Sequence, residues 1–215
     1  MYEAEAPSRL QEEMSAPPIV CETRSGEGVV FLDLQSDEYS CSYEPLSGMQ
    51  PYSPTAPPLS GSGISITRPP VAEPVWLELA SRDAPVISLR DVSRFATALL
   101  QSVLWFRNRP VRELLHRVSS RRDVKLRAEV GYDEVARRFD RLLAMLPVQP
   151  ACLFRSFFLL NFMHLYGLGA DWNFGVQLFP FRAHCWVARG NMLLNETSHA
   201  IEEYRVIHAV RATGG

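Results

Sequence analysis

Residues 152–166 read CLFRSFFLLNFMHLY, a stretch that is apolar on nearly every side when it is wound as a helix. Such a helix has no continuous polar face to present to water, so it belongs in the interior of a fold. Gly167 and Gly169 follow directly and are suited to end it. The stretch therefore predicts a central helix against which the other elements pack.

Strand-like runs follow this helix, and helix-like runs precede it. The runs typical of strands are 174–179, 184–189, 192–195 and 204–210. Gly190-Asn191 is a two-residue turn sequence that predicts a hairpin between the middle two. Apolar residues at spacings of three and four predict helices over about 92–104, 110–118 and 135–146. For the first of these we expect Asp91 or Ser93 near the N-terminal cap. The pattern indicates an α+β fold with helices packed on an antiparallel sheet.

The N-terminal third has a different character. Residues 1–17 are rich in Glu, Ser and Pro and predict a flexible terminus. Short β-like runs at 19–22, 28–34 and 38–43 predict a three-stranded meander. Prolines and glycines crowd residues 47–74, which excludes a regular helix and indicates either a linker or a loop-rich part of a small domain. We therefore expect a flexible segment 1–17, a small β-rich unit 18–74 and a main domain 75–215.

Composition excludes several classes of protein. A chain of 215 residues that is 47% hydrophobic can bury a substantial core. Its net charge of -2 disfavours a nucleic-acid partner, and the basic cluster at 117–122 is typical of a solvated helix end. Four cysteines without a CxxC pair predict neither a disulfide framework nor a metal site. With no secretory signal and no apolar run long enough for a bilayer, we expect a cytoplasmic protein without a membrane contact.

Three residues in the last third form a candidate catalytic set. Cys152 stands where the central helix would begin, His184 follows in a strand-like run, and Glu196 comes after the predicted hairpin. A thiol at a helix N-terminus is favoured as its thiolate, and a histidine oriented by a carboxylate can act as its base. The order is one that a thiol protease or a transglutaminase would need.

Each of these residues also has a purely structural interpretation. Free cysteine is among the most buried residue types, so Cys152 could simply pack in the core. The alternation of a strand places Cys185 on the face opposite His184, which indicates a packing role for Cys185 rather than a second nucleophile. The pattern of residue types alone leaves both interpretations open.

A resemblance favours catalysis. Residues 151–156 (ACLFRS), Gly167, residues 175–187 (GVQLFPFRAHCWV) and Asn195-Glu196 together resemble the lasso-peptide biosynthesis B protein, a transglutaminase-like leader peptidase. The resemblance covers roughly residues 85–210. It implies a papain/transglutaminase-like cysteine peptidase domain with Cys152, His184 and Glu196 as catalytic residues. The family usually has aspartate at the third position, and Asn195 is a second candidate for that role.

The same resemblance implies a substrate and partners. It implies removal of the leader peptide from a ribosomally made precursor, before macrolactam closure by an asparagine-synthetase-like cyclase. Residues 28–39 are similar to two strands of a PqqD-like leader-recognition element. No phosphate-binding loop of the GxxxxGK type occurs, so we expect no cofactor and no metal, and we expect any ATP requirement to lie in the cyclase.

Leader capture would most naturally add a strand to an exposed sheet edge. The candidate edge is 38–43, with Glu38, Tyr39, Cys41 and Tyr43 as candidate leader-binding residues. Alternation places Tyr39 and Tyr43 on one face, where they could bury apolar leader residues or only pack the small sheet. Two rival functions remain at this stage: a non-catalytic leader-binding adaptor, and an acyltransferase that passes the acyl group to an amine.

Overall fold

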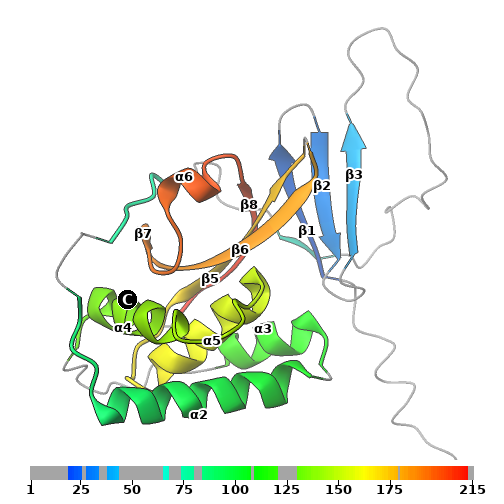
Figure 1. Ribbon diagram of the computed structural model, residues 1–215. Helices are drawn as coiled ribbons and strands as arrows, with labels where there is room; N and C mark the ends of the chain where they lie inside the picture. The colour runs from blue at the N-terminus through cyan, green and yellow to red at the C-terminus, as the bar shows by residue number, and fades with distance from the viewer. Residues whose placement is uncertain are drawn as a thin grey trace, which may run out of the picture.

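The computed structural model describes residues 19–25, 28–33, 38–43, 65–67, 74–79, 84–107, 109–120, 130–178 and 180–212, and the side chains of 19–29, 42–43 and 65–67 are left undescribed. Two four-stranded sheets and a set of helices make up this part of the chain (Figure 1). The expected flexible segment 1–17 lies outside the described residues.

The N-terminal sheet contains the expected meander and one further strand. Its order is β3-β2-β1-β4, with β1 Ile19–Ser25, β2 Gly28–Asp33, β3 Glu38–Tyr43 and β4 Ser65–Thr67. The meander strands pair antiparallel, whereas β4 pairs parallel to β1. Part of the proline-rich stretch 47–74 therefore belongs to the small sheet rather than to a linker.

The second sheet is antiparallel throughout, as expected. Its order is β7-β6-β5-β8, with β5 Asp171–Gln177, β6 Arg182–Arg189, β7 Met192–Leu193 and β8 Arg205–Val210. Gly190 has φ 60°, a left-handed conformation that glycine adopts without steric cost, and it turns the predicted hairpin between β6 and β7. Leu77 bridges to Met192 in parallel, so the segment 74–79 lies along the outer edge of β7.

Four longer helices cover one face of this sheet. They are α2 Leu89–Phe106, α3 Val111–Ser119, α4 Tyr132–Leu143 and α5 Cys152–His164. Figure 1 shows α5 between α2 and the sheet, which confirms the central helix. A short helix, α6 Ser198–Ile201, lies over the other face and was not predicted.

The sheet separates two hydrophobic clusters. Phe157 and Phe158 of α5 pack with Trp172 of β5 in the larger cluster, and all three side chains are fully buried. On the opposite face Trp186 packs edge-to-face against Trp76, with ring centroids 5.7 Å apart. The alternation of β6 produces this division, because Cys185 and Val187 belong to the first cluster and Trp186 to the second.

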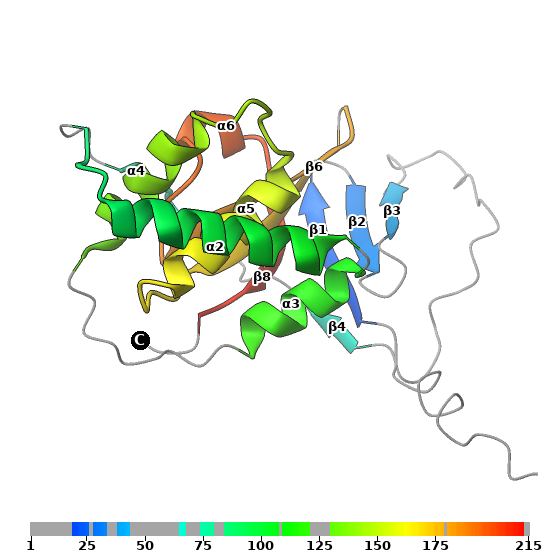
Figure 2. The ribbon, with the colours of Figure 1, turned by 60° about the horizontal axis from the view of Figure 1, so that its bottom comes forward.

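The N-terminal sheet shares the larger cluster. Val30 and Leu32 of β2 are 0% and 4% exposed and belong to the same core as α5. Figure 2 shows the small sheet at the end of the second sheet, with α3 below it. Strands β1 and β8 lie next to each other. The two sheets are thus joined by buried apolar side chains.

Some element bounds differ from the predicted ones for local reasons. The cap of α2 is Ser88 rather than Asp91 or Ser93, and Ser88 and Asp91 form a reciprocal capping box. Strand β7 ends at Leu193 because the side chain of Asn195 accepts the hydrogen bond from the Val187 N–H, at 2.8 Å. Helix α4 ends at Leu143, and turns continue to Leu146.

Asp91 joins three parts of the helical layer. Its carboxylate caps α2 through Ser88, accepts a hydrogen bond from the Tyr166 hydroxyl and pairs with Arg138 of α4 at 3.2 Å. Burial alone would raise the pKa of Asp91, but the hydrogen bonds from Tyr166 and Ser88 and the charge of Arg138 hold it below its ordinary value. The side chain is only 2% exposed.

We predict that Asp91→Ala lowers the free energy of unfolding by about 3 kcal/mol, because it leaves the buried Tyr166 hydroxyl without its acceptor, takes one of two carboxylate partners from Arg138 and removes a helix cap. Urea unfolding followed by circular dichroism would measure the change. Glu202→Ala is the matched control, since Glu202 pairs with His199 at the surface, where the two side chains are 74% and 96% exposed, and its loss should cost less than about 0.5 kcal/mol. Equal effects of the two substitutions would contradict the role given to Asp91.

Candidate active site

Cys152 is the first residue of α5. The preceding Ala151 is extended, with φ -59° and ψ 156°, and gives no side-chain cap. The first backbone N–H groups of α5, at the end of the helix that carries Cys152, therefore have no intrahelical partner. The positive end of the helix dipole lies at the same end. Pro150 ahead of Ala151 favours an extended chain entering the helix. This local sequence produces a helix start that stabilises an anion.

His184 on β6 lies between Cys152 and Glu196. Its Nε2 is 3.1 Å from Oε1 of Glu196, which leaves Nδ1 as the nitrogen that faces the Cys152 sulfur. Glu196 is 16% exposed at its side chain. Burial would raise the pKa of Glu196, but the hydrogen bond and charge of His184 hold it below its ordinary value. The structure therefore brings the three predicted residues together, and the glutamate reaches the imidazole.

The thiol and the imidazole shift each other's pKa in opposite directions. Hydrogen bonds from the Cys185 thiol and from His184, together with the imidazolium charge, lower the pKa of Cys152 to about 4. The hydrogen bonds to Cys152 and Glu196 raise the pKa of His184 to about 9, against the effect of burial. Between these two values the pair is a thiolate and an imidazolium, the form in which a cysteine attacks a carbonyl.

Cys185 has more than the packing role expected from its position. It is 2% exposed and faces away from Trp186, as the alternation of β6 predicts. Its thiol nonetheless reaches the Cys152 sulfur, and this hydrogen bond together with burial raises the pKa of Cys185. Cys185 therefore stays protonated and donates to the thiolate.

Ser156 and Asn195 form a buried network beneath the three residues. Ser156 lies one turn after Cys152, and its hydroxyl donates to the carbonyl oxygen of Cys185 at 3.2 Å. The Asn195 amide donates to Ser156 Oγ at 3.2 Å, while its oxygen accepts from Val187 N at 2.8 Å. The network connects α5 with β6 and with the residue before Glu196. The Asn195 side chain therefore bonds to Ser156 and Val187, and Glu196 is the residue that contacts His184.

Sequence reasoning missed Ser156 and the role of Cys185. The available signal was a small polar residue four positions after the thiol in a helix that is otherwise apolar. A buried hydroxyl in such a helix needs a partner outside it or a carbonyl in the preceding turn. The identity of that partner depends on how α5 packs on β6.

Two aromatic side chains pack against the His184 imidazole. The His184 ring stacks on Trp186 at a centroid distance of 6.2 Å and contacts Tyr204 at 5.4 Å. Gly175 is paired with His184 across the sheet, and a Cβ there would come within 2.7 Å of the Trp186 ring. Glycine at 175 therefore allows the indole to lie against the β5 backbone and support His184.

Arg155 adds a cation behind Glu196. Its guanidinium is 3.9 Å from Glu196 Oε1 and 3.3 Å from Asp140 on α4. The charge of Arg155 contributes to the low pKa of Glu196. Burial raises the pKa of Asp140, against the effect of Arg155. Arg155 thus connects the carboxylate of the site to the helical layer.

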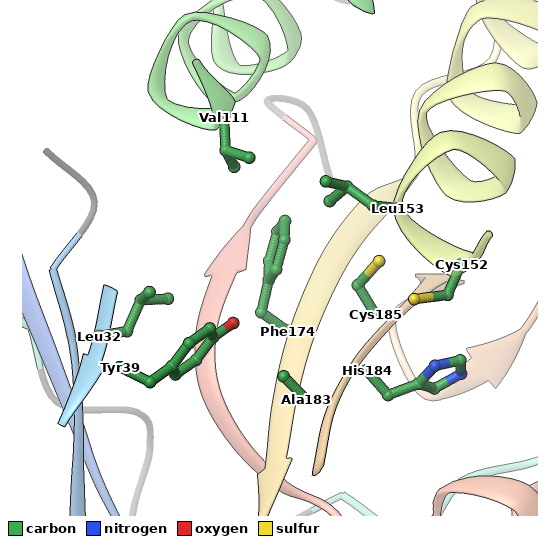
Figure 3. A pocket seen from close by; sticks show the side chains of 9 residues that line it. All are labelled: Leu32, Tyr39, Val111, Cys152, Leu153, Phe174, Ala183, His184 and Cys185. Atoms are coloured by element: carbon green, nitrogen blue, oxygen red, sulfur yellow. The ribbon is translucent and has the colours of Figure 1, made fainter. Parts of the chain in front are cut away.

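A cavity of about 250 Å³ opens beside the thiol. Figure 3 shows Cys152, His184 and Cys185 on one side of it, with Phe174 and Val111 along its length. Leu32 and Tyr39 come from the N-terminal sheet and close the far side. Most of its lining side chains are apolar, so the cavity can accept an apolar side chain next to the nucleophile.

The candidate leader-binding residues lie on β3, at the edge of the small sheet. Tyr39 is half-buried, contacts Phe181 edge-to-face at 5.6 Å and lines the cavity. Glu38 and Cys41 are exposed, and burial of part of the Cys41 thiol raises its pKa. The side chain of Tyr43 lies outside the described residues. The inward face of β3 therefore meets the cavity through Tyr39.

Comparison with known proteins identifies the family. A family model described as the Transglutaminase-like superfamily matches residues 93–209, more than half of the chain. The chain belongs to the transglutaminase-like superfamily. No curated protein and no solved structure matches it significantly. The transglutaminase-like match runs from α2 to β8, so it includes Cys152, His184 and Glu196 but not the N-terminal sheet.

Neither a metal site nor a membrane-spanning helix is present among the described residues. No group of three or more His, Cys, Asp or Glu side chains in this part of the transglutaminase-like chain is arranged to hold a metal ion. None of its described helices combines the length and apolarity that a membrane crossing requires.

We predict that iodoacetamide alkylates Cys152 rapidly at pH 5 to 6 and that the rate falls only as the pH drops through about 4. The thiolate is the reacting form, and a depressed pKa keeps it present in mild acid. Rates would be measured by mass spectrometry of the modified peptides, with the exposed Cys41 as an internal control that reacts only in alkaline solution.

Glu196→Gln should raise the pH at which Cys152 alkylation begins to slow in acid. Without the carboxylate the pKa of His184 falls, and a less basic imidazole stabilises the thiolate less. Identical pH profiles for Cys152 and Cys41 would contradict the ion pair.

Proposed function

We propose that this protein is a cysteine peptidase that removes the leader peptide from a ribosomally made lasso-peptide precursor. The observation that carries the proposal is the thiolate and imidazolium pair at the start of α5, which opens onto a cavity walled in part by the N-terminal sheet. Membership of the transglutaminase-like superfamily supports acyl chemistry at Cys152. The sequence resemblance to the lasso-peptide B protein supports the leader as substrate.

In the proposed reaction the Cys152 thiolate attacks the carbonyl carbon at the junction of leader and core. The tetrahedral intermediate collapses when the His184 imidazolium gives its proton to the leaving amine, which frees the N-terminus of the core peptide. The leader is then held as a thioester on Cys152. Neutral His184 takes a proton from water, the hydroxide attacks the thioester, and the leader leaves with a free carboxylate while Cys152 returns as thiolate.

The neighbours of the pair support these steps. Glu196 would fix the orientation of the imidazole and stabilise its protonated form. The backbone N–H of Cys152, at the uncapped end of α5, is the natural donor to the oxyanion. The Cys185 thiol lowers the basicity of the nucleophile before attack and is released as the sulfur forms its bond to carbon.

The N-terminal sheet offers a path to the thiol. No strand in the described part of the chain pairs with the outer edge of β3, so a leader segment could add there as a further strand. Glu38, Cys41 and Tyr43 would border that strand, and Tyr39 would lie between it and the cavity. We propose that residues 18–74 form the leader-recognition unit, similar to a PqqD-like element, and that 75–215 form the peptidase domain.

The proposed partners follow from the chemistry. The reaction leaves a free core amine, which an asparagine-synthetase-like cyclase would join to a side-chain carboxylate of the core peptide. That ring closure requires an activated carboxylate, so ATP would be consumed in the cyclase. The proposal places the peptidase in the cytoplasm, where the precursor is made.

We expect Cys152→Ala to reduce leader removal by at least about 10³-fold, because the nucleophile is lost. The purified protein would be combined with a candidate lasso-peptide precursor and a cyclase, and the products would be identified by mass spectrometry. His199→Ala, which removes an exposed side chain on α6 outside the cavity, should retain full activity.

Unchanged leader removal by Cys152→Ala would favour the adaptor function instead. A leader joined to an amine, rather than a leader with a free carboxylate, would identify an acyltransferase.

Tyr39→Ala should raise KM for the precursor about tenfold, as the loss of about 1.4 kcal/mol of binding predicts, with little change in kcat. The reason is that Tyr39 lines the side of the cavity opposite Cys152 and His184 (Figure 3). Steady-state kinetics with the full precursor would separate the two constants. Alkylation of Cys152 should stay at the wild-type rate, and a fall in that rate would show that Tyr39 supports the site itself.

A further inference from the structure

A second and larger cavity, of about 960 Å³, lies between α3, the end of α2 and β8. Its walls carry four arginines, Arg109, Arg112, Arg117 and Arg211, and one carboxylate, Glu113. This is a strong local excess of positive charge in a chain whose net charge is -2. The basic cluster at 117–122, which the sequence pattern predicted as a solvated helix end, therefore begins with a residue that lines a cavity.

The positive charge of this cavity is only partly neutralised. Arg109 pairs with Glu113 at 2.5 Å, and Arg211 reaches Asp171 at 3.4 Å. Arg112 and Arg117 have no carboxylate partner in the described part of the chain. Two guanidinium groups thus remain available to an anionic ligand.

Arg117 is held in a setting that disfavours its charge. Its guanidinium lies 3.9 Å from the ring centroid of Trp105, and that of Arg109 lies 4.3 Å from the same centroid. Burial and the neighbouring charge of Arg109 lower the pKa of Arg117. Its Nε is buried and has no hydrogen-bond partner. An anion entering the cavity would relieve the repulsion and supply the missing acceptor.

The spacing of the arginines indicates the form of the ligand. Arg112 lies in the first turn of α3 and Arg117 in the last, which separates them by roughly 7.5 Å along the helix axis. The cavity, at about 960 Å³, is far larger than a single small anion would fill, whereas an extended peptide segment could occupy it and carry carboxylates to both arginines. Arginine also matches the two oxygens of a carboxylate.

Nucleic acid fits this cavity less well. The ring of Trp105 already stacks with two guanidinium groups, which would compete with a base for that ring. The acidic net charge of the chain gives no wider field that would collect a polyanion.

We propose that the cavity between α3 and β8 binds a peptide segment that carries several carboxylates. Val111 lines the cavity beside Cys152, and the adjacent Arg112 lines the basic cavity. A peptide bound in the basic cavity could therefore continue along α3 to the cavity beside Cys152. The binding itself does not depend on any reaction at Cys152.

The test is fluorescence anisotropy of the full-length protein with labelled hexaglutamate and hexaglutamine peptides at low ionic strength. We expect hexaglutamate to bind at least tenfold more tightly than hexaglutamine and to weaken as salt screens the arginines. Arg112→Glu should weaken hexaglutamate binding at least tenfold, and because Arg112 is exposed this variant should fold normally. Arg117→Gln should weaken it by a smaller factor.

Arg90→Glu is the matched control, since it reverses an exposed arginine on α2 outside the cavity and should change binding less than twofold. Equal binding of the two peptides, or equal loss in Arg90→Glu and Arg112→Glu, would overturn the proposal. A labelled single-stranded oligonucleotide that binds more tightly than hexaglutamate and is lost in Arg112→Glu would overturn the peptide as ligand. Cys152→Ala should bind hexaglutamate as the wild type does, whatever its activity.

Discussion

The hydrogen-bond network of Ser156 and Asn195 is the constraint on which the candidate site depends. The thiol, the imidazole and the carboxylate come from a helix, a strand and the turn after a hairpin, so these three elements must be held in register for the groups to meet. The Ser156 hydroxyl donates to the Cys185 carbonyl and so fixes α5 to β6. Asn195, directly before Glu196, donates to the Ser156 oxygen and accepts from the Val187 N–H of β6. Because these groups are buried, any displacement would leave polar atoms without partners in an apolar core.

The fold was largely predictable from the sequence because its main elements have strong local signals. Residues 152–166 are apolar all round, and Gly190-Asn191 permits a tight turn, so the central helix and the hairpin followed from residue types alone. Short elements without such a signal, such as α6 and β4, were missed. The cap of α2 was misplaced because Ser88 and Asp91 act as a pair.

The candidate site was predictable in its members but not in its surroundings. Cys152, His184 and Glu196 could be named as candidates from a helix start, a strand and a hairpin, but only the family resemblance favoured catalysis over packing. The contact between Cys185 and Cys152 depends on the distance between α5 and β6, which no pattern of residue types specifies. The same holds for Leu32, more than a hundred positions from Cys152 in the chain, which reaches the cavity only because β2 shares the core of α5.

The segment 74–79 has a consequence for how the molecule meets other chains. The N–H of Leu77 donates to Asn191 O at 2.9 Å and its carbonyl accepts from Leu193 N at 2.8 Å, so the outer side of β7 is already hydrogen-bonded. Unpaired strand edges invite aggregation and domain exchange between copies of a protein. This segment caps the β7 end of the sheet against such self-association, while the outer edge of β3 has no partner strand in the described part of the chain. One edge is therefore closed to strand addition, whereas no described strand occupies the other.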